Sequence, residues 1–115
     1  MVTPAAKVVV LVPFPFSDLS QAKPRPAIVL ADAGRGDWIL CQVTSKPYGD
    51  SRAIALSNED FASGSLRIAS AARPGKLFTA SHDLMVARVG VLHEEPFARI
   101  VAAIVGLLQP PIPST

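Results

Sequence analysis

Two polar groups that suit phosphate chemistry flank one predicted hairpin. Arg25 stands in a basic, proline-rich segment, and Thr44 and Ser45 end a later apolar run, with strands predicted at residues 27–31 and 37–45 around a Gly-rich turn. The start of the first strand of an antiparallel hairpin lies beside the end of the second. We therefore expect Arg25 and Thr44 to meet at the open end, where the planar guanidinium could bind a phosphate.

Further polar residues extend this candidate site. Gln42 precedes Thr44 by two residues and so shares its strand face. Lys23 and Arg25 each precede a proline, which favours an extended backbone. Each residue alone is equally compatible with an ordinary turn or strand end. As a set, we expect the following residues to bind the same ligand: Asp18, Lys23, Gln42, Ser45, Lys46, Ser70 and Arg73.

The residues that acid–base or metal chemistry would use lie outside this set. His82 fits a turn, His93 fits the approach to a helix, and Cys41 lies in an apolar run, as expected of a buried structural thiol. The sequence has no Cys/His cluster with metal-ligand spacing, no phosphate-binding glycine loop and no serine-hydrolase motif. We therefore expect neither a metal nor a cofactor.

The composition predicts one small domain with a substantial core. The chain has 115 residues, half of them apolar, and a formal net charge of +2, which is compatible with a nucleic-acid partner but does not decide for one. No apolar run approaches the roughly 18–20 residues that span a bilayer, and the run at 8–12 is too short for a signal peptide. We expect one cytoplasmic domain over 1–115, with its core at 7–108 and a disordered tail at 109–115.

Short strand patterns separated by turns fill most of the chain. Besides the hairpin, β-branched and apolar residues predict strands at 7–13, 52–56, 66–71, 76–80 and 84–92. A proline-containing loop is expected at 14–21, a helical turn at 57–61 that ends by Gly64, turns at Pro74-Gly75 and 81–83, and a bend or bulge at Gly90.

Residues 94–108 carry the only long helical pattern. Its apolar residues recur with a period of 3.6: Phe97, Ile100, Val101, Ile104, Val105 and Leu108. Glu94 and Glu95 suit the positive N-terminal end of a helix, and Pro110-Pro111 would stop it. Six or seven short strands and one helix predict a mainly β fold, a small, partly closed antiparallel barrel capped by a C-terminal helix.

Five segments also follow one another in a characteristic order. They are VVVLVPFPFSDLS, KPRPAIVLA, ILCQVTS, GSLRIASAARPGKLFT and MVARVGVL before the helix. KPRPAIVLA matches a basic-x-Arg-Pro-Ala-apolar signature, and ILCQVTS matches an apolar strand ending in Thr-Ser. In this order and spacing they resemble the MazF/PemK-type toxins of bacterial type II toxin–antitoxin systems over residues 7–108.

The resemblance implies a fold and an activity. The fold is an SH3-like β-barrel with a C-terminal helix, usually a homodimer, and the activity is metal-independent cleavage of single-stranded RNA. An antitoxin inactivates such toxins by covering the RNA groove, and the family's catalytic pair corresponds to Arg25 and Thr44. The RNA 2′-hydroxyl attacks the adjacent phosphorus and leaves a 2′,3′-cyclic phosphate and a 5′-hydroxyl, so no protein nucleophile is needed. Positioned donors stabilise the developing charge, and DNA should bind without being cut.

Two departures from the family pattern leave the general base open. Family members usually begin with Gly-Asp where this chain has Ala6-Lys7, and many carry an acid in the loop where residues 20–22 have none. Asp18 serves as the base, or no base is needed, or activity is reduced. Two other interpretations remain, namely a non-catalytic SH3-like module that binds nucleic acid or protein, and a gyrase-inhibiting toxin of the same fold.

Overall fold

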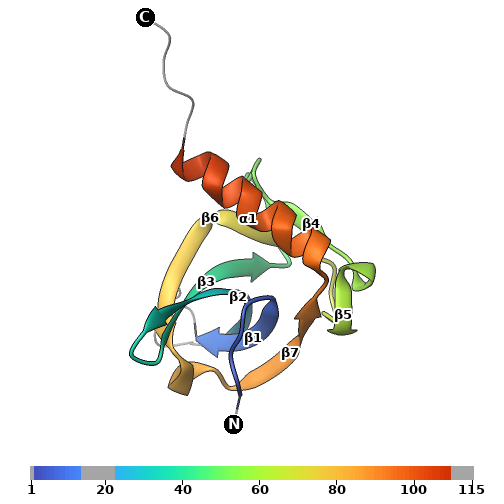
Figure 1. Ribbon diagram of the computed structural model, residues 1–115. Helices are drawn as coiled ribbons and strands as arrows, with labels where there is room; N and C mark the ends of the chain where they lie inside the picture. Colours follow the sequence, from blue (N-terminus) through green and yellow to red (C-terminus); the bar gives the residue numbers. More distant parts are fainter. Residues whose placement is uncertain (1, 14–22, 110–115) are drawn as a thin grey trace, which may run out of the picture.

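In the part of the chain that the structure describes, a curled antiparallel sheet is packed against one α-helix (Figure 1). The computed structural model describes residues 2–13 and 23–109. Its sheet has the strand order β4-β6-β3-β2-β1-β7-β5, so β4 and β5 are the edges and the barrel is only partly closed. The elements are β1 (Val8–Pro13), β2 (Pro24–Gly34), β3 (Asp37–Thr44), β4 (Ile54–Leu56), η2 (Asn58–Asp60), β5 (Phe61–Gly64), β6 (Ser70–Ser81), η3 (His82–Leu84), β7 (Ala87–Leu92) and α1 (Glu94–Leu108). The predicted mainly β fold with a terminal helix is confirmed.

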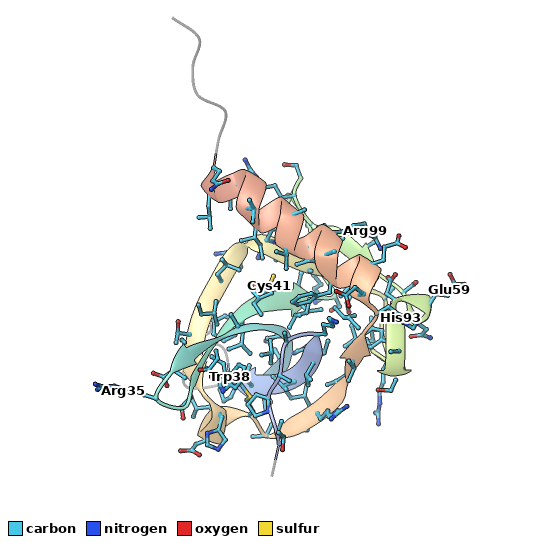
Figure 2. All side chains as sticks on the ribbon, viewed as in Figure 1. Arg35, Trp38, Cys41, Glu59, His93 and Arg99 are labelled. Carbon is cyan, nitrogen blue, oxygen red and sulfur yellow. The ribbon has the colours of Figure 1, made fainter. Side chains whose placement is uncertain are left out.

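The predicted central hairpin is formed by β2 and β3, which pair with Ala27 opposite Gln42. Its tip is a two-residue turn in which Arg35 and Gly36 both have positive φ, 58° and 81°. Such turns match the twist of the strands that they join. Figure 2 shows the Arg35 side chain pointing outward from this tip. β2 begins earlier than predicted, at Pro24, because the fixed φ of proline is compatible with an extended strand.

Both faces of the central strands are buried. One face packs inside the barrel, with Val10, Val29 and Leu40 fully buried there. The other face packs against α1, where Ile28 and Cys41 meet Ile100 of the helix. Alternate residues along each strand point to opposite faces, so near-continuous apolar runs supply both layers.

The helix spans the predicted residues, Glu94–Leu108, and lies across β6 (Figure 1). Ile100 and Ile104 are buried, whereas Leu108 of the same apolar pattern is 68% exposed. Gln109 ends the helix by donating its N–H to the carbonyl of Val105 (2.8 Å), and the rest of the predicted tail lies outside the described residues. Within the described part of the chain, no helix is long and apolar enough to cross a membrane.

Lys7, the second residue of the Ala6-Lys7 pair that departs from the family pattern, is held in place by backbone and side-chain contacts. Lys7 adopts the left-handed region (φ 80°), which disfavours side chains with a β-carbon. Its backbone donates to Val29 (3.1 Å) and accepts from Leu92 (2.9 Å), and its Nζ lies 2.6 Å from Oε2 of Glu94. Lys7 therefore joins β2, β7 and the first turn of α1.

Two predictions between residues 61 and 75 are wrong. Residues 61–64 form the edge strand β5, and residues 65–69 bend without joining a strand, where a strand over 66–71 was predicted. Pro74-Gly75 is not a turn but part of β6, where Cys41 pairs with Leu77 and Val43 with Ala72. One β3 residue thus faces four residues of β6, so pairing along the rest of β3 holds the Pro-Gly dipeptide inside a large bulge.

The other predicted strands form with different bounds: the strand predicted at 52–56 is β4, the one at 76–80 is part of β6, and the one at 84–92 is β7, which begins at Ala87 because η3 occupies the preceding residues. The loop predicted at 14–21 lies outside the described residues.

The predicted helical turn at 57–61, the turn at 81–83 and the bulge at Gly90 are confirmed. The helical turn appears as η2, and Ser81 caps η3 by accepting from the backbone N–H of Asp83 (3.2 Å). The β1–β7 register shifts next to Gly90, as expected of a bulge. Gly90 also permits the close approach of β5, because a β-carbon there would overlap the carbonyl oxygen of Ser63.

Candidate active site

A cavity of about 610 Å³ opens at the end of the hairpin opposite its turn, and we call it the groove. Five of the residues predicted to form the site line it together: Arg25, Gln42, Thr44, Ser45 and Ser70. Arg25 comes from β2, Gln42 and Thr44 from β3, Ser45 directly follows β3, and Ser70 begins β6. The other lining residues are Leu11, Pro26, Val43, Ser65, Leu66, Arg67, Ile68, Arg88 and Val89.

The strand register explains why Arg25 and Thr44 meet. Ala27 pairs with Gln42, and continuing this antiparallel register by two residues places Arg25 opposite Thr44. Thr44 itself pairs with Ala71 of β6. The Arg25 side chain is exposed, and no hydrogen bond or ion pair engages its guanidinium within the described part of the chain. It can therefore bind an anion in the groove without breaking an internal contact.

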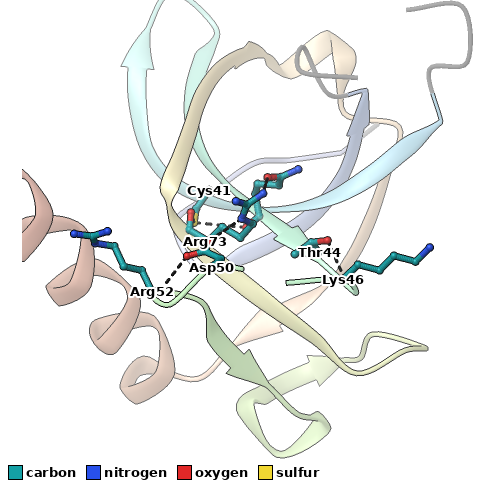
Figure 3. Close-up of polar contacts among 7 residues, drawn as sticks. Cys41, Thr44, Lys46, Asp50, Arg52 and Arg73 are labelled. Carbon is teal, nitrogen blue, oxygen red and sulfur yellow. Dashed lines mark hydrogen bonds and ion pairs between the residues drawn. The ribbon is translucent and has the colours of Figure 1, made fainter. Parts of the chain in front are cut away.

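The Thr44 hydroxyl is held by the backbone that follows it. Its Oγ1 accepts a hydrogen bond from the N–H of Lys46 at 3.1 Å (Figure 3). A hydroxyl has one proton and two acceptor lone pairs, so the proton stays available for a ligand in the groove. The Lys46 side chain is exposed and does not line the groove, so Lys46 takes part through its backbone.

Sequence reasoning missed two groove arginines, Arg67 and Arg88. Arg67 lies in the bend at 65–69, where the sequence predicted a strand over 66–71. Arg88 interrupts the apolar run of β7, which is the one signal that could have identified it. With Arg25 they bring three guanidinium groups to the groove, and none of the described residues that line it is acidic. This charge distribution favours an anionic ligand.

Arg73 does not line the groove, but its side chain contacts Gln42, which does. Its Nε lies 2.7 Å from Oδ2 of Asp50 (Figure 3), and its Nη1 donates to Oε1 of Gln42 at 3.4 Å. The hydrogen bond from Arg73, with a second from the backbone N–H of Arg52, holds the pKa of Asp50 below its usual value. Arg73 therefore reaches the groove only through Gln42.

The remaining predicted residues fall elsewhere. Lys23 is exposed just before β2 and does not line the groove, and Asp18 lies outside the described residues. His82 contacts Asp83 (3.4 Å) beside a separate cavity, and His93 is exposed at the start of α1 (Figure 2). Neither histidine lines the groove.

Cys41 is buried, as predicted. Its Sγ donates to the carbonyl of Arg73 at 3.2 Å, and burial raises the pKa of the thiol to about 12. The thiol is therefore protonated at neutral pH and unsuited to nucleophilic attack. In the described residues, no group of three or more histidine, cysteine, aspartate or glutamate side chains could hold a metal ion.

Solved structures share this fold. The MazF structure from Deinococcus radiodurans matches with a TM-score of 0.73 at 20% identity, over 94% of this chain and 98% of that one. An endoribonuclease in complex with its cognate antitoxin, from a mycobacterial species, matches with a TM-score of 0.69 at 15% identity, over 98% of this chain and 100% of that one. The chain therefore has the fold of these structures, a curled half-barrel with a C-terminal helix.

The solved structures show the fold, and a comparison of the sequence with protein-family models also shows the family. The family model for the PemK-like, MazF-like toxin of type II toxin–antitoxin systems matches residues 6–108. The chain belongs to this family of toxins. A comparison with curated proteins gives no match.

Proposed function

We propose that this toxin is a metal-independent endoribonuclease that cleaves single-stranded RNA in the groove. The observation that carries the proposal is the joint presence of Arg25, Thr44 and two further arginines around a cavity with no acidic lining residue among those described. RNA has the 2′-hydroxyl that this reaction needs, so the protein has only to bind the phosphate and stabilise charge.

In the proposed reaction the 2′-oxygen forms a bond to the adjacent phosphorus while the bond from phosphorus to the 5′-oxygen breaks. Arg25 donates to the phosphoryl oxygens, and the Thr44 proton supports the same developing charge. The departing 5′-oxygen takes up a proton, and the 2′-hydroxyl loses one. The described groove residues are arginines, hydroxyls, an amide and apolar side chains, none of which is a base at neutral pH. The proton that the 2′-hydroxyl loses therefore passes to solvent or to Asp18, which lies outside the described residues, and solvent supplies the proton that the 5′-oxygen takes up.

The charge of the groove also supports a proposal about the binding partners of this toxin. The mycobacterial relative is described as bound to its cognate antitoxin. A cationic groove offers an acidic segment of an antitoxin the same attraction that it offers RNA, so an antitoxin that covers the groove would block cleavage. We propose such an antitoxin, a homodimeric toxin and a cytoplasmic location, where RNA is available.

Cleavage of a long unstructured RNA in the presence of EDTA tests the proposal. Wild-type protein should cut it and leave 2′,3′-cyclic phosphate ends, and Arg25→Ala should lose about 10²–10³ in rate. Arg35→Ala is the matched control, because Arg35 lies at the hairpin tip (Figure 2) and does not line the groove. If wild-type protein does not cleave the RNA, the endoribonuclease proposal is refuted and a non-catalytic binding module is favoured. If the protein also lowers DNA supercoiling by gyrase, a gyrase inhibitor is favoured instead. Equal cleavage by wild type and Arg25→Ala refutes the site.

A further inference from the structure

The β6 bulge gives Arg73 a position that regular pairing would not. Gln42 is the β3 residue that faces this bulge, because Cys41 pairs with Leu77 and Val43 with Ala72. The bulge begins at Arg73, whose carbonyl accepts from the buried thiol of Cys41 at 3.2 Å. Bulges of this kind often redirect a side chain next to a site. Here the redirected side chain is Arg73, and it meets Gln42.

Asp50 holds the guanidinium of Arg73 in place. Oδ2 of Asp50 lies 2.7 Å from Nε of Arg73, and Oδ1 accepts from the backbone N–H of Arg52 at 2.9 Å. The Asp50 side chain is only 13% exposed and the Arg73 side chain 28%, so solvent screens the pair less than a surface ion pair. Arg73 is therefore fixed both through its backbone carbonyl and through its guanidinium.

This arrangement decides which end of the Gln42 amide faces the groove. A guanidinium only donates hydrogen bonds, so the atom of Gln42 that faces Arg73 must be the oxygen, and the distance is 3.4 Å. The amide nitrogen is then the end left for a ligand. Gln42 lines the groove beside Arg25 and Thr44, which we assign to the phosphate. An uncharged amide with two donors is suited to an acceptor on a base edge.

We propose that Gln42 determines sequence specificity by donating from its amide nitrogen to a base next to the scissile phosphate, and that Arg73, held by Asp50, is the positioning residue that orients this amide. The proposal rests on the proposed endoribonuclease function. It assigns Arg73 to support of Gln42 and not to direct contact with RNA.

A double-mutant cycle on sequence preference tests the proposal. The variants are Gln42→Ala, Arg73→Lys and the double variant, with cleavage sites mapped along an RNA of mixed sequence and folding checked by thermal unfolding. Lysine keeps the charge but cannot contact Asp50 and Gln42 with one planar fork. Each single variant should lose on the order of tenfold in discrimination at one nucleotide position. The double variant should match Gln42→Ala, because Arg73 acts through Gln42.

Arg52→Lys is the matched control. Arg52 contacts Asp50 only through its backbone N–H, and its side chain points away from Arg73 (Figure 3). This variant should keep the wild-type preference. A general drop in rate at unchanged preference, in either Gln42→Ala or Arg73→Lys, would overturn the proposal.

A second measurement separates this proposal from the proposed enzyme activity. The same variants are used to select from a randomised pool of 2′-fluoro RNA, which can bind but cannot be cleaved because it lacks the attacking hydroxyl. A base preference in the bound wild-type pool that Gln42→Ala removes supports the recognition role even if wild-type protein cuts no RNA. Wild-type binding without any base preference, or no binding at all, would overturn it.

Discussion

The hydroxyl of Thr44 offers the sharpest test of how the groove stabilises charge. Its Oγ1 already accepts from the N–H of Lys46 at 3.1 Å, so the proton is the part of the group that a phosphoryl oxygen can use. Valine has nearly the same shape as threonine and lacks only this hydroxyl. Thr44→Val should therefore keep the packing of β3 while it removes one positioned donor. Serine restores the donor, so Thr44→Ser is the matched control.

The expected magnitudes differ for stability and for rate. Loss of the half-exposed hydrogen bond to Lys46 should cost about 0.5–1.5 kcal/mol of unfolding free energy. Loss of a donor that acts in the transition state should lower kcat by about 10²–10³, equivalent to about 2.7–4 kcal/mol. Thr44→Ser should stay within about tenfold of wild type, since one tenfold step corresponds to only about 1.4 kcal/mol.

Single-turnover cleavage of an RNA oligonucleotide with EDTA, measured over a range of excess protein concentrations up to saturation, separates the rate of the chemical step from binding. Thermal unfolding measures stability. If Thr44→Val raises only KM and leaves kcat unchanged, the hydroxyl binds substrate without stabilising the transition state. That result would refute the assignment, as would equal losses in the serine and valine variants.

Three other predictions concern stability and reactivity. Lys7→Gly should be more stable than Lys7→Ala by about 1–2 kcal/mol in chemical denaturation. Both variants lose the ion pair with Glu94, and only glycine adopts a φ of 80° without strain. Equal stability of the two variants would show that the backbone there is unstrained. Since the folded-state pKa of Asp50 is lowered from 3.8, its contribution to stability is complete above that value and is lost as pH falls below it. Asp50→Asn should flatten this acid dependence, and an unchanged acid profile would contradict the ion pair. The pKa of Cys41 is raised from 9.0 to about 12, so the thiol should resist iodoacetamide at pH 9–10 in the folded protein and react once denaturant is added. Its contribution to stability should fall as the pH rises from 9 toward 12. Rapid labelling of the folded protein would disprove burial.

Local sequence determined the hairpin and the helix. Arg35 and Gly36 lie within one tight turn, and the apolar period over 94–108 lies within one helix, so each depends on residues close together in the chain. The meeting of Arg25 and Thr44 follows from the same hairpin, because a tight turn sets the register of both its strands. These features were predicted from the sequence for that reason.

Local sequence misled at residues 61–75, where tertiary pairing decided the structure. Pro74-Gly75 has the local preference of a turn, but β6 pairs along β3 on both sides of the dipeptide, and the summed pairing outweighs the local preference. The extra residues are absorbed as a bulge. The local preferences of one segment do not show how strongly that segment pairs with a strand elsewhere in the chain.

The same limit applies to the groove. The sequence by itself indicated the family and predicted that Arg25 and Thr44 lie close together, because one hairpin carries both. Only the tertiary structure brought Arg67 and Arg88 to the groove and placed Arg73 behind it, against Asp50. Arg73 and Gln42 are 31 residues apart in the chain, and strand pairing across that separation brings them together. Such contacts depend on how a whole sheet closes, which the preferences of neighbouring residues do not specify.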